Sequence, residues 1–102
     1  MKVTVAEKHE QIIELCLQYH VHRLALFGSA LRDDFDPQRS DLDFVVEFEP
    51  LPPGTYAKTY FGLIGELERL FGRRVDLVES GAVRNPYFRQ EIEGTQETLY
   101  AA

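Results

Sequence analysis

Residues 24–48 have the sequence LALFGSALRDDFDPQRSDLDFVVEF, in which two apolar segments flank a turn and a polar loop. Leu24–Phe27 is short, apolar and followed by glycine, which predicts a buried strand. Gly28 and Ser29 predict a tight turn that opens a helical turn, and an acidic loop follows. A second strand is expected to begin near Asp41. This order of strand, turn, helix, loop and strand is the part of the fold from which the other elements are predicted.

Two carboxylates, Asp41 and Asp43, stand at the start of the second expected strand. Side chains alternate between the faces of a strand, so both share one face with Val45 and Glu47. The opposite face is apolar and consists of Leu42, Phe44, Val46 and Phe48. Neighbouring carboxylates repel each other unless a cation lies between them, and oxygen ligands suit Mg²⁺ or Mn²⁺. Asp41 and Asp43 are therefore candidate metal ligands.

Gly28 and Ser29 form a candidate phosphate-binding turn. Gly28 lets a phosphate approach the main chain, and free N–H groups at the start of a helix attract an anion. Ser29 either caps the helical turn or donates its hydroxyl to a phosphate, and the nearby aspartates favour the second role. Arg32 either contacts phosphate oxygens or pairs with a neighbouring aspartate, and the sequence leaves both open. A phosphate-binding turn beside a metal site is the minimum equipment for transferring part of a nucleoside triphosphate.

The length of 102 residues predicts one domain that spans residues 1–102. Its 44% hydrophobic and 27% charged residues are ordinary for a soluble globular protein. The polar first residues do not resemble a signal peptide, and no run approaches the roughly 18 apolar residues of a membrane span. A cytoplasmic protein without a membrane partner is therefore expected. The net charge of −6, with scattered lysines and arginines, makes direct binding of nucleic acid unfavourable.

A first helix is predicted from Thr4 to about Tyr19, because apolar residues recur there at helical spacing. Cys16 lies in this apolar stripe and is interpreted as a small buried side chain rather than a nucleophile. As the sole cysteine, it excludes an internal disulfide. His20 and His22 are interpreted as polar residues between helix and strand rather than as metal ligands.

Tyr56–Phe71 is the clearest predicted helix, and Gly72 supplies its C-terminal stop. Its apolar face, which starts with Tyr56, is assigned to packing against a sheet. A third strand is predicted at Arg73–Glu79. Asp76 in this strand is unfavourable without a partner, and a salt bridge to an adjacent arginine is one solution.

A last helix is expected from Asn85-Pro86, followed by a short edge strand at Thr98–Tyr100. The predicted order of elements is therefore α-β-α-β-α-β-α. Apolar strands that alternate with amphipathic helices indicate an α/β (α+β) fold, a small mixed β-sheet of three to four strands flanked by helices.

Gly28-Ser29, Arg32 and Ser40-Asp41-Leu42-Asp43 together resemble the signature of the DNA polymerase beta-like nucleotidyltransferase superfamily. The short chain, with ELERLFGRRVDLVES at 66–80 and NPYFRQEI at 85–92, is similar to the minimal nucleotidyltransferases, the MNT or MntA antitoxins. The resemblance implies the polymerase beta-like nucleotidyltransferase fold. It also implies Gly28, Ser29 and Arg32 as nucleotide-binding residues. The catalytic metal ligands implied are Asp41, Asp43 and Asp76, which would hold two Mg²⁺ ions, or Mn²⁺, about 3.5–4 Å apart.

The resemblance further implies a Mg²⁺-dependent nucleotidyltransferase that transfers AMP from ATP to a tyrosine of a cognate HEPN toxin, as the antitoxin of a type VII toxin–antitoxin system. The alternative is a non-catalytic binding module that neutralises a HEPN-family partner by contact alone. A protein acceptor suits a chain too small to enclose a deep pocket by itself. The candidate docking surfaces are the loop Leu51–Tyr56 and the terminal helix with Tyr87 and Phe88, and the sequence does not choose between them.

Overall fold

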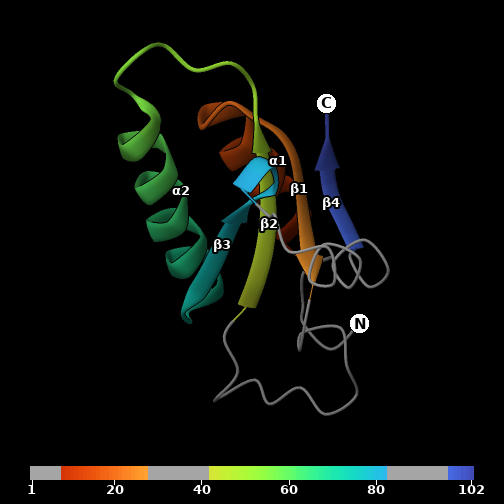
Figure 1. The fold of residues 1–102 in the computed structure, drawn as a ribbon. Helices are drawn as coiled ribbons and strands as arrows, with labels where there is room; N and C mark the ends of the chain where they lie inside the picture. Colours follow the sequence, from red (N-terminus) through yellow and green to blue (C-terminus); the bar gives the residue numbers. More distant parts are fainter. Residues whose placement is uncertain (1–7, 28–41, 83–96) are drawn as a thin grey trace.

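The structure, a computed structural model, describes residues 8–27, 42–82 and 97–102 (Figure 1). Its elements, in chain order, are α1 (His9–Gln18), β1 (Val21–Phe27), β2 (Leu42–Phe48), α2 (Tyr56–Phe71), β3 (Val75–Glu79), the short 3-10 helix η3 (Ser80–Ala82) and β4 (Glu97–Ala101). None of the described helices is long and apolar enough to cross a bilayer.

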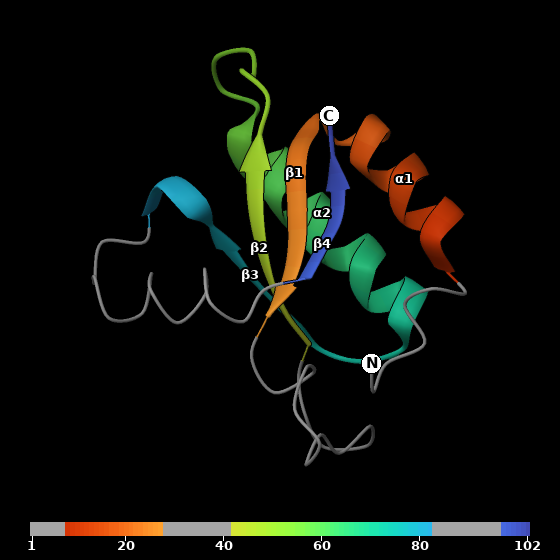
Figure 2. The same cartoon turned by 90° about the vertical axis from the view of Figure 1, so that its right-hand side faces the viewer.

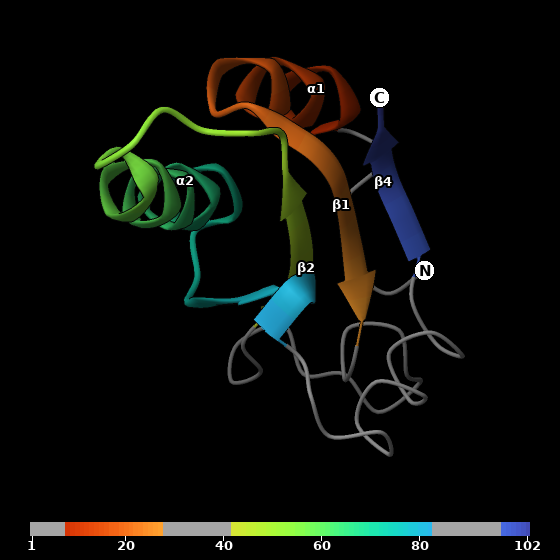
Figure 3. The ribbon, with the colours of Figure 1, turned by 45° about the horizontal axis from the view of Figure 1, so that its top comes forward.

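The described strands form one four-stranded mixed sheet in the order β3-β2-β1-β4. β1 runs antiparallel to both β2 and β4, whereas β2 and β3 are parallel. Both described helices, α1 and α2, pack against the same face of the sheet (Figures 2 and 3). The predicted α+β architecture with a small mixed sheet is confirmed, and β4 is the expected edge strand near the C-terminus.

The core lies between the helices and this face of the sheet. Alternate residues of the strands point into it, because successive side chains of a strand face opposite sides. Its fully buried members come from both layers and are Ile12, Cys16, Leu24, Leu26, Leu42, Phe44, Val46, Leu63 and Leu67. The apolar stripe predicted for the first helix is thus confirmed. Burial raises the pKa of Cys16 to about 12, so its thiol stays protonated and unreactive at neutral pH.

β1 begins at Val21 rather than at Leu24, where the sequence predicts it. The difference arises because β1 is an inner strand with a partner on each edge. Val21 is paired with Phe48 of β2, and Arg23 is paired with Ala101 of β4. Backbone hydrogen bonds along both edges keep the polar residues after Val21 in the strand, although their side chains would not predict one.

β3 and α1 also differ in extent from the prediction. β3 begins at Val75 rather than at Arg73, because its pairing with β2 starts where Leu42 meets Val75. α1 ends at Gln18, and the expected beginning of the first helix lies outside the described residues. The same holds for the helical turn expected after Ser29 and for the last helix.

α2 has the predicted bounds, and Gly72 ends it with a φ of 67°. Glycine adopts this left-handed conformation at no steric cost, and the Gly72 N–H donates to the carbonyl oxygen of Glu68 (2.8 Å). Tyr56, predicted to pack with the apolar face of the helix, instead lies outside the core and is 46% exposed. It stands in the first turn of α2 and meets Phe48, the last residue of β2, edge to face with 5.8 Å between ring centroids.

Candidate functional site

Asp43 and Asp76 lie side by side on the parallel strands β2 and β3, where they are paired in register. Neighbouring strands are about 4.8 Å apart, which brings the two carboxylates to one place on the sheet. The residues that flank them in the strands belong to the core, and these are Leu42, Phe44, Val75 and Leu77. Both aspartates therefore point to the opposite face, away from the helices, and Asp76 is the more exposed.

Asp43 also lies beside the end of β1, because it is paired with Phe27, the last residue of that strand. Gly28 and Ser29 follow Phe27 directly in the sequence. The sheet thus places the strand that precedes the candidate phosphate-binding turn next to the strand that carries Asp43. From the predicted site residues, the structure brings together Asp43 and Asp76. Those that lie outside the described residues are Gly28, Ser29, Arg32 and Asp41.

The pair of carboxylates fits a hard divalent cation, because carboxylate oxygens are the ligands such ions prefer. In the described part of the chain, Asp76 forms no ion pair with Arg73 or Arg74. No group of three or more histidine, cysteine or acidic side chains converges within residues 8–27, 42–82 and 97–102. Asp43 and Asp76 would therefore supply two ligands, and Asp41 is the third that the sequence predicts.

Side chains of α2 hold the outer edge of β3 on both sides of Asp76. The Val75 N–H donates to Oε2 of Glu68 (3.2 Å), and the Tyr60 hydroxyl donates to the carbonyl oxygen of Leu77. Among the described strands β3 lies at the edge of the sheet, so none of them pairs with these backbone groups on that side. The helix takes the place of a further strand and fixes the position of Asp76. In the sequence, Tyr60 belongs to the apolar face that is predicted to pack against the sheet, and no local pattern singles out Glu68.

The two histidines after α1 lie where helix gives way to strand, as predicted. His20 is in the turn before β1 and has a φ of 58°. His22 is in β1, and its Nδ1 lies 2.9 Å from Oε1 of Glu49. Neither belongs to a metal-binding cluster in the part of the chain that the structure describes.

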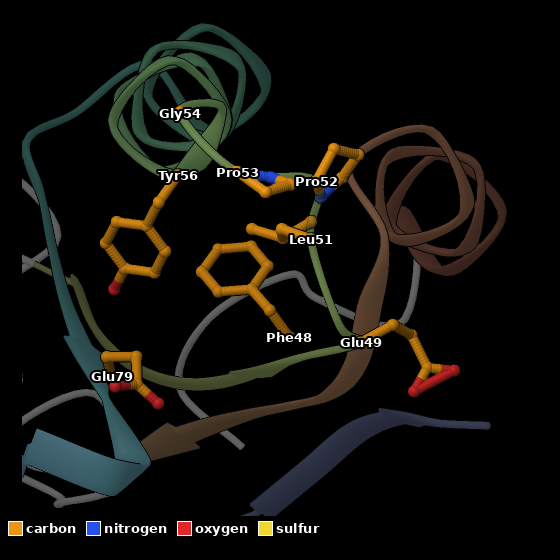
Figure 4. A pocket seen from close by; sticks show the side chains of 8 residues that line it. All are labelled: Phe48, Glu49, Leu51, Pro52, Pro53, Gly54, Tyr56 and Glu79. Carbon is orange, nitrogen blue, oxygen red and sulfur yellow. The ribbon is translucent and has the colours of Figure 1, made fainter.

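A groove of about 390 Å³ opens at the far end of β2 from Asp43 (Figure 4). Its apolar lining includes Phe48, Leu51, Pro53 and Tyr56, and Glu79 lies at the end of β3. The groove includes much of the loop Leu51–Tyr56, one of the two candidate docking surfaces. Phe48 and Glu79 could not be assigned to it from the sequence, because the pairing of β2 with β3 brings these strand ends together.

Comparison with known proteins identifies relatives of this chain. The family model for the nucleotidyltransferase domain matches residues 9–96. A candidate protein adenylyltransferase of Methanocaldococcus jannaschii is 39% identical over 89 residues, which cover 87% of this chain and 85% of that protein.

Solved structures share the fold. A candidate minimal nucleotidyltransferase is 30% identical and superposes with a TM-score of 0.74, covering 92% of this chain and 91% of that one. A chain from the complex of the tri-AMPylated HEPN toxin of Shewanella oneidensis with its MNT antitoxin has a TM-score of 0.65 at 19% identity. That match covers 95% of this chain and 72% of the other.

Proposed function

The chain belongs to the nucleotidyltransferase domain family, and from this membership we propose that it is a Mg²⁺-dependent protein adenylyltransferase acting on a HEPN-type partner. The substrate is ATP, and the acceptor is a tyrosine hydroxyl of the partner. The observation that carries the proposal is the register of Asp43 with Asp76 on the face of the sheet opposite α1 and α2, beside the end of β1. Two carboxylates on adjacent strands, beside the strand end that precedes Gly28-Ser29 in the sequence, match the chemistry that nucleotide transfer needs.

In the proposed reaction the acceptor oxygen forms a bond to the α-phosphorus of ATP, and the bond between this phosphorus and the bridging oxygen breaks. Pyrophosphate leaves, the tyrosine proton passes to solvent, and the product is tyrosine-AMP. Asp41, Asp43 and Asp76 are the residues that would hold Mg²⁺. When bound, the metal would neutralise phosphate charge and acidify the acceptor hydroxyl.

The protein's own contribution is to position the reactants. We assign the triphosphate to the main-chain N–H groups of Gly28 and Ser29, with Arg32 as a further phosphate contact. We assign Asp76 to the acceptor side, because it stands on the edge strand and is the more exposed of the two described carboxylates. Transfer of this kind depends chiefly on positioning and electrostatics, which a small domain can supply.

A protein acceptor agrees with the charge of the chain. A net charge of −6 repels polynucleotides. A structure with the same fold contains an AMP-modified HEPN toxin bound to its MNT antitoxin, which supports a HEPN-type partner. The partner would bring its own surface to the pair of carboxylates.

The test uses the chain purified with a cognate HEPN-domain partner and given ATP labelled at either the α- or the γ-phosphate. Label from the α-phosphate should enter the partner, and label from the γ-phosphate should not. Asp43→Asn and Asp76→Asn should each lower transfer by about a hundredfold or more, with Asp76→Asn retaining ATP–Mg²⁺ binding. Glu47→Gln is the matched control, because Glu47 is an exposed carboxylate on the same strand and face as Asp43.

Removal of Mg²⁺ by a chelator should stop transfer, and Mn²⁺ should restore it. If the partner is neutralised but never labelled, the chain acts as a binding module and the enzymatic proposal is wrong. If both aspartate variants keep Mg²⁺-dependent transfer, the assignment of the metal ligands is wrong.

A further inference from the structure

The groove at the far end of β2 combines an aromatic wall with a carboxylate. Phe48 and Tyr56 form the aromatic part, and Leu51 and Pro53 extend the apolar lining. In Figure 4 the Tyr56 hydroxyl points toward Glu79, while the carboxylate of Glu49 is turned away from the groove. Glu49 instead approaches His22, with 2.9 Å between Oε1 and Nδ1. Glu79 is therefore the carboxylate that faces the aromatic wall.

A hydrogen bond orients the carboxylate of Glu79, and one of its oxygens remains able to accept another. Its Oε1 accepts a hydrogen bond from the Gly81 N–H (3.0 Å), and Oε2 accepts none from the residues that the structure describes. Burial and then the charge of Glu79 raise the pKa of Tyr56, which agrees with a negative charge close to the ring. The groove thus presents a fixed negative group beside exposed aromatic surface.

Local hydrogen bonds and prolines restrict the loop that builds the groove. The hydroxyl of Thr55 donates to the carbonyl oxygen of Pro52 (2.7 Å), and the Thr55 N–H donates to the same oxygen (3.2 Å). Two consecutive prolines, Pro52 and Pro53, further restrict the backbone. Tyr56 is stacked on Tyr60 with 5.9 Å between ring centroids, which limits the motion of its ring. Binding here costs little conformational entropy.

An arginine side chain matches this groove better than other protein groups. A guanidinium stacks on aromatic rings, is weakly hydrated and donates hydrogen bonds in a planar array to a carboxylate. A lysine offers a compact charge that does not stack in this way, and an acidic group would be repelled by Glu79. We propose that this groove binds an arginine side chain of the partner protein, with the guanidinium between Glu79 and the aromatic wall of Phe48 and Tyr56.

The groove is separate from the carboxylate pair. Val46 is paired with Glu79, three register positions beyond the pair of Asp43 and Asp76, which corresponds to about 10 Å along the strands. Phe48 packs against the core on the helix side of the sheet, whereas the two aspartates face the other side. The inference rests on the proposed function for one point, that the partner is the protein acceptor, and it assigns the groove to docking rather than to chemistry.

The direct test is a titration of the ¹⁵N-labelled chain with N-acetyl-arginine amide, followed by NMR. The amides of Gly54 and Glu79 should shift with saturation. N-acetyl-citrulline amide has almost the same shape without the charge and should bind at least about fivefold more weakly. Glu79→Gln should cause a similar loss, and Glu14→Gln, which removes an exposed carboxylate from α1, should cause none. Equal binding of the two probes, or no shift at Gly54 and Glu79, would overturn the proposal.

A second readout is the transfer reaction with the partner. Glu79→Gln and Tyr56→Ala should raise the KM for the partner about five- to tenfold and leave the KM for ATP unchanged. An unchanged KM for the partner would contradict docking through the groove. Absence of transfer in the unmodified protein would refute the adenylyltransferase proposal instead, and the arginine titration would still decide the groove.

Discussion

Replacing Tyr60 by phenylalanine tests whether α2 holds the strand that carries Asp76. The Tyr60 hydroxyl donates to the carbonyl oxygen of Leu77. Directly before β3, the carbonyl oxygen of Arg74 accepts from the N–H of Leu42, so Arg74 points toward β2. Leu77 follows an odd number of residues later and points to the other edge of β3. Tyr60→Phe therefore leaves this half-buried carbonyl without its partner and changes almost nothing else.

The expected loss of stability is about 1 kcal/mol, the net value of one intramolecular hydrogen bond. For a domain of this size, that corresponds to a fall in Tm of about 4–8 °C. Amide hydrogen exchange in β3 should accelerate with the same change, because local opening of an edge strand becomes easier. Transfer activity should fall as well, since Asp76 lies next to Leu77.

The assay is thermal and urea unfolding followed by far-UV circular dichroism, with Tyr56→Phe as the matched control. Tyr56 lies one turn earlier in α2, is 46% exposed, and its hydroxyl forms no hydrogen bond within the residues that the structure describes. The control should stay within about 0.5 kcal/mol of the unmodified protein. Equal stability of the two variants would show that the contact between Tyr60 and Leu77 does not hold β3.

Two further predictions concern the core and α2. Gly65→Ala should raise the free energy of unfolding by about 0.5–1 kcal/mol, because a Cβ there meets nothing within 4 Å. Gly62→Ala should lower the free energy of unfolding, because its Cβ would lie 2.8 Å from Cε1 of Tyr19. A higher Tm for Gly62→Ala would show that the Tyr19 ring yields easily. The folded pKa of Cys16, about 12, exceeds its ordinary value of 9.0, so the stability that its protonated thiol contributes is complete below about pH 9 and is lost as the pH rises toward 12. In urea unfolding, Cys16→Ala should lack this part of the loss of stability at alkaline pH. A thiol reagent should modify Cys16 in the native protein only at the rate at which the protein unfolds. Rapid modification at neutral pH would contradict the burial of Cys16.

The sequence predicts α2 and the faces of the described strands well, because these follow from local periodicity. Tyr56–Phe71 and its glycine stop agree with the structure, as does the alternation that turns Asp43 away from the core. The extent of β1 could not be predicted, since His22 and Arg23 are polar and lie in the strand only because it has partners on both edges. Helix bounds and strand faces are local properties, whereas strand extent depends on tertiary pairing.

The residues of the candidate site can also be predicted from the sequence only in part. The aspartates are visible in the sequence, but the register of Asp43 with Asp76 depends on the parallel pairing of β2 with β3, which no local pattern encodes. The contacts of Tyr60 and Glu68 with the edge of β3 also join residues from separate elements. The groove near Glu79 could not be predicted from the sequence either, because its lining residues come from separate elements. The sequence shows which side chains could bind or react, but only the fold shows which of them lie together.

The most direct test of the account is a double-mutant cycle on AMP transfer with Asp43→Asn, Asp76→Asn and the combination, measured as kcat/KM with the HEPN-type partner. Residues that hold one metal site act as a unit, so the double variant should lose about as much activity as the worse single variant. If the two losses multiply instead, Asp43 and Asp76 act independently. A shared site on the face of the sheet opposite α1 and α2 would then be wrong.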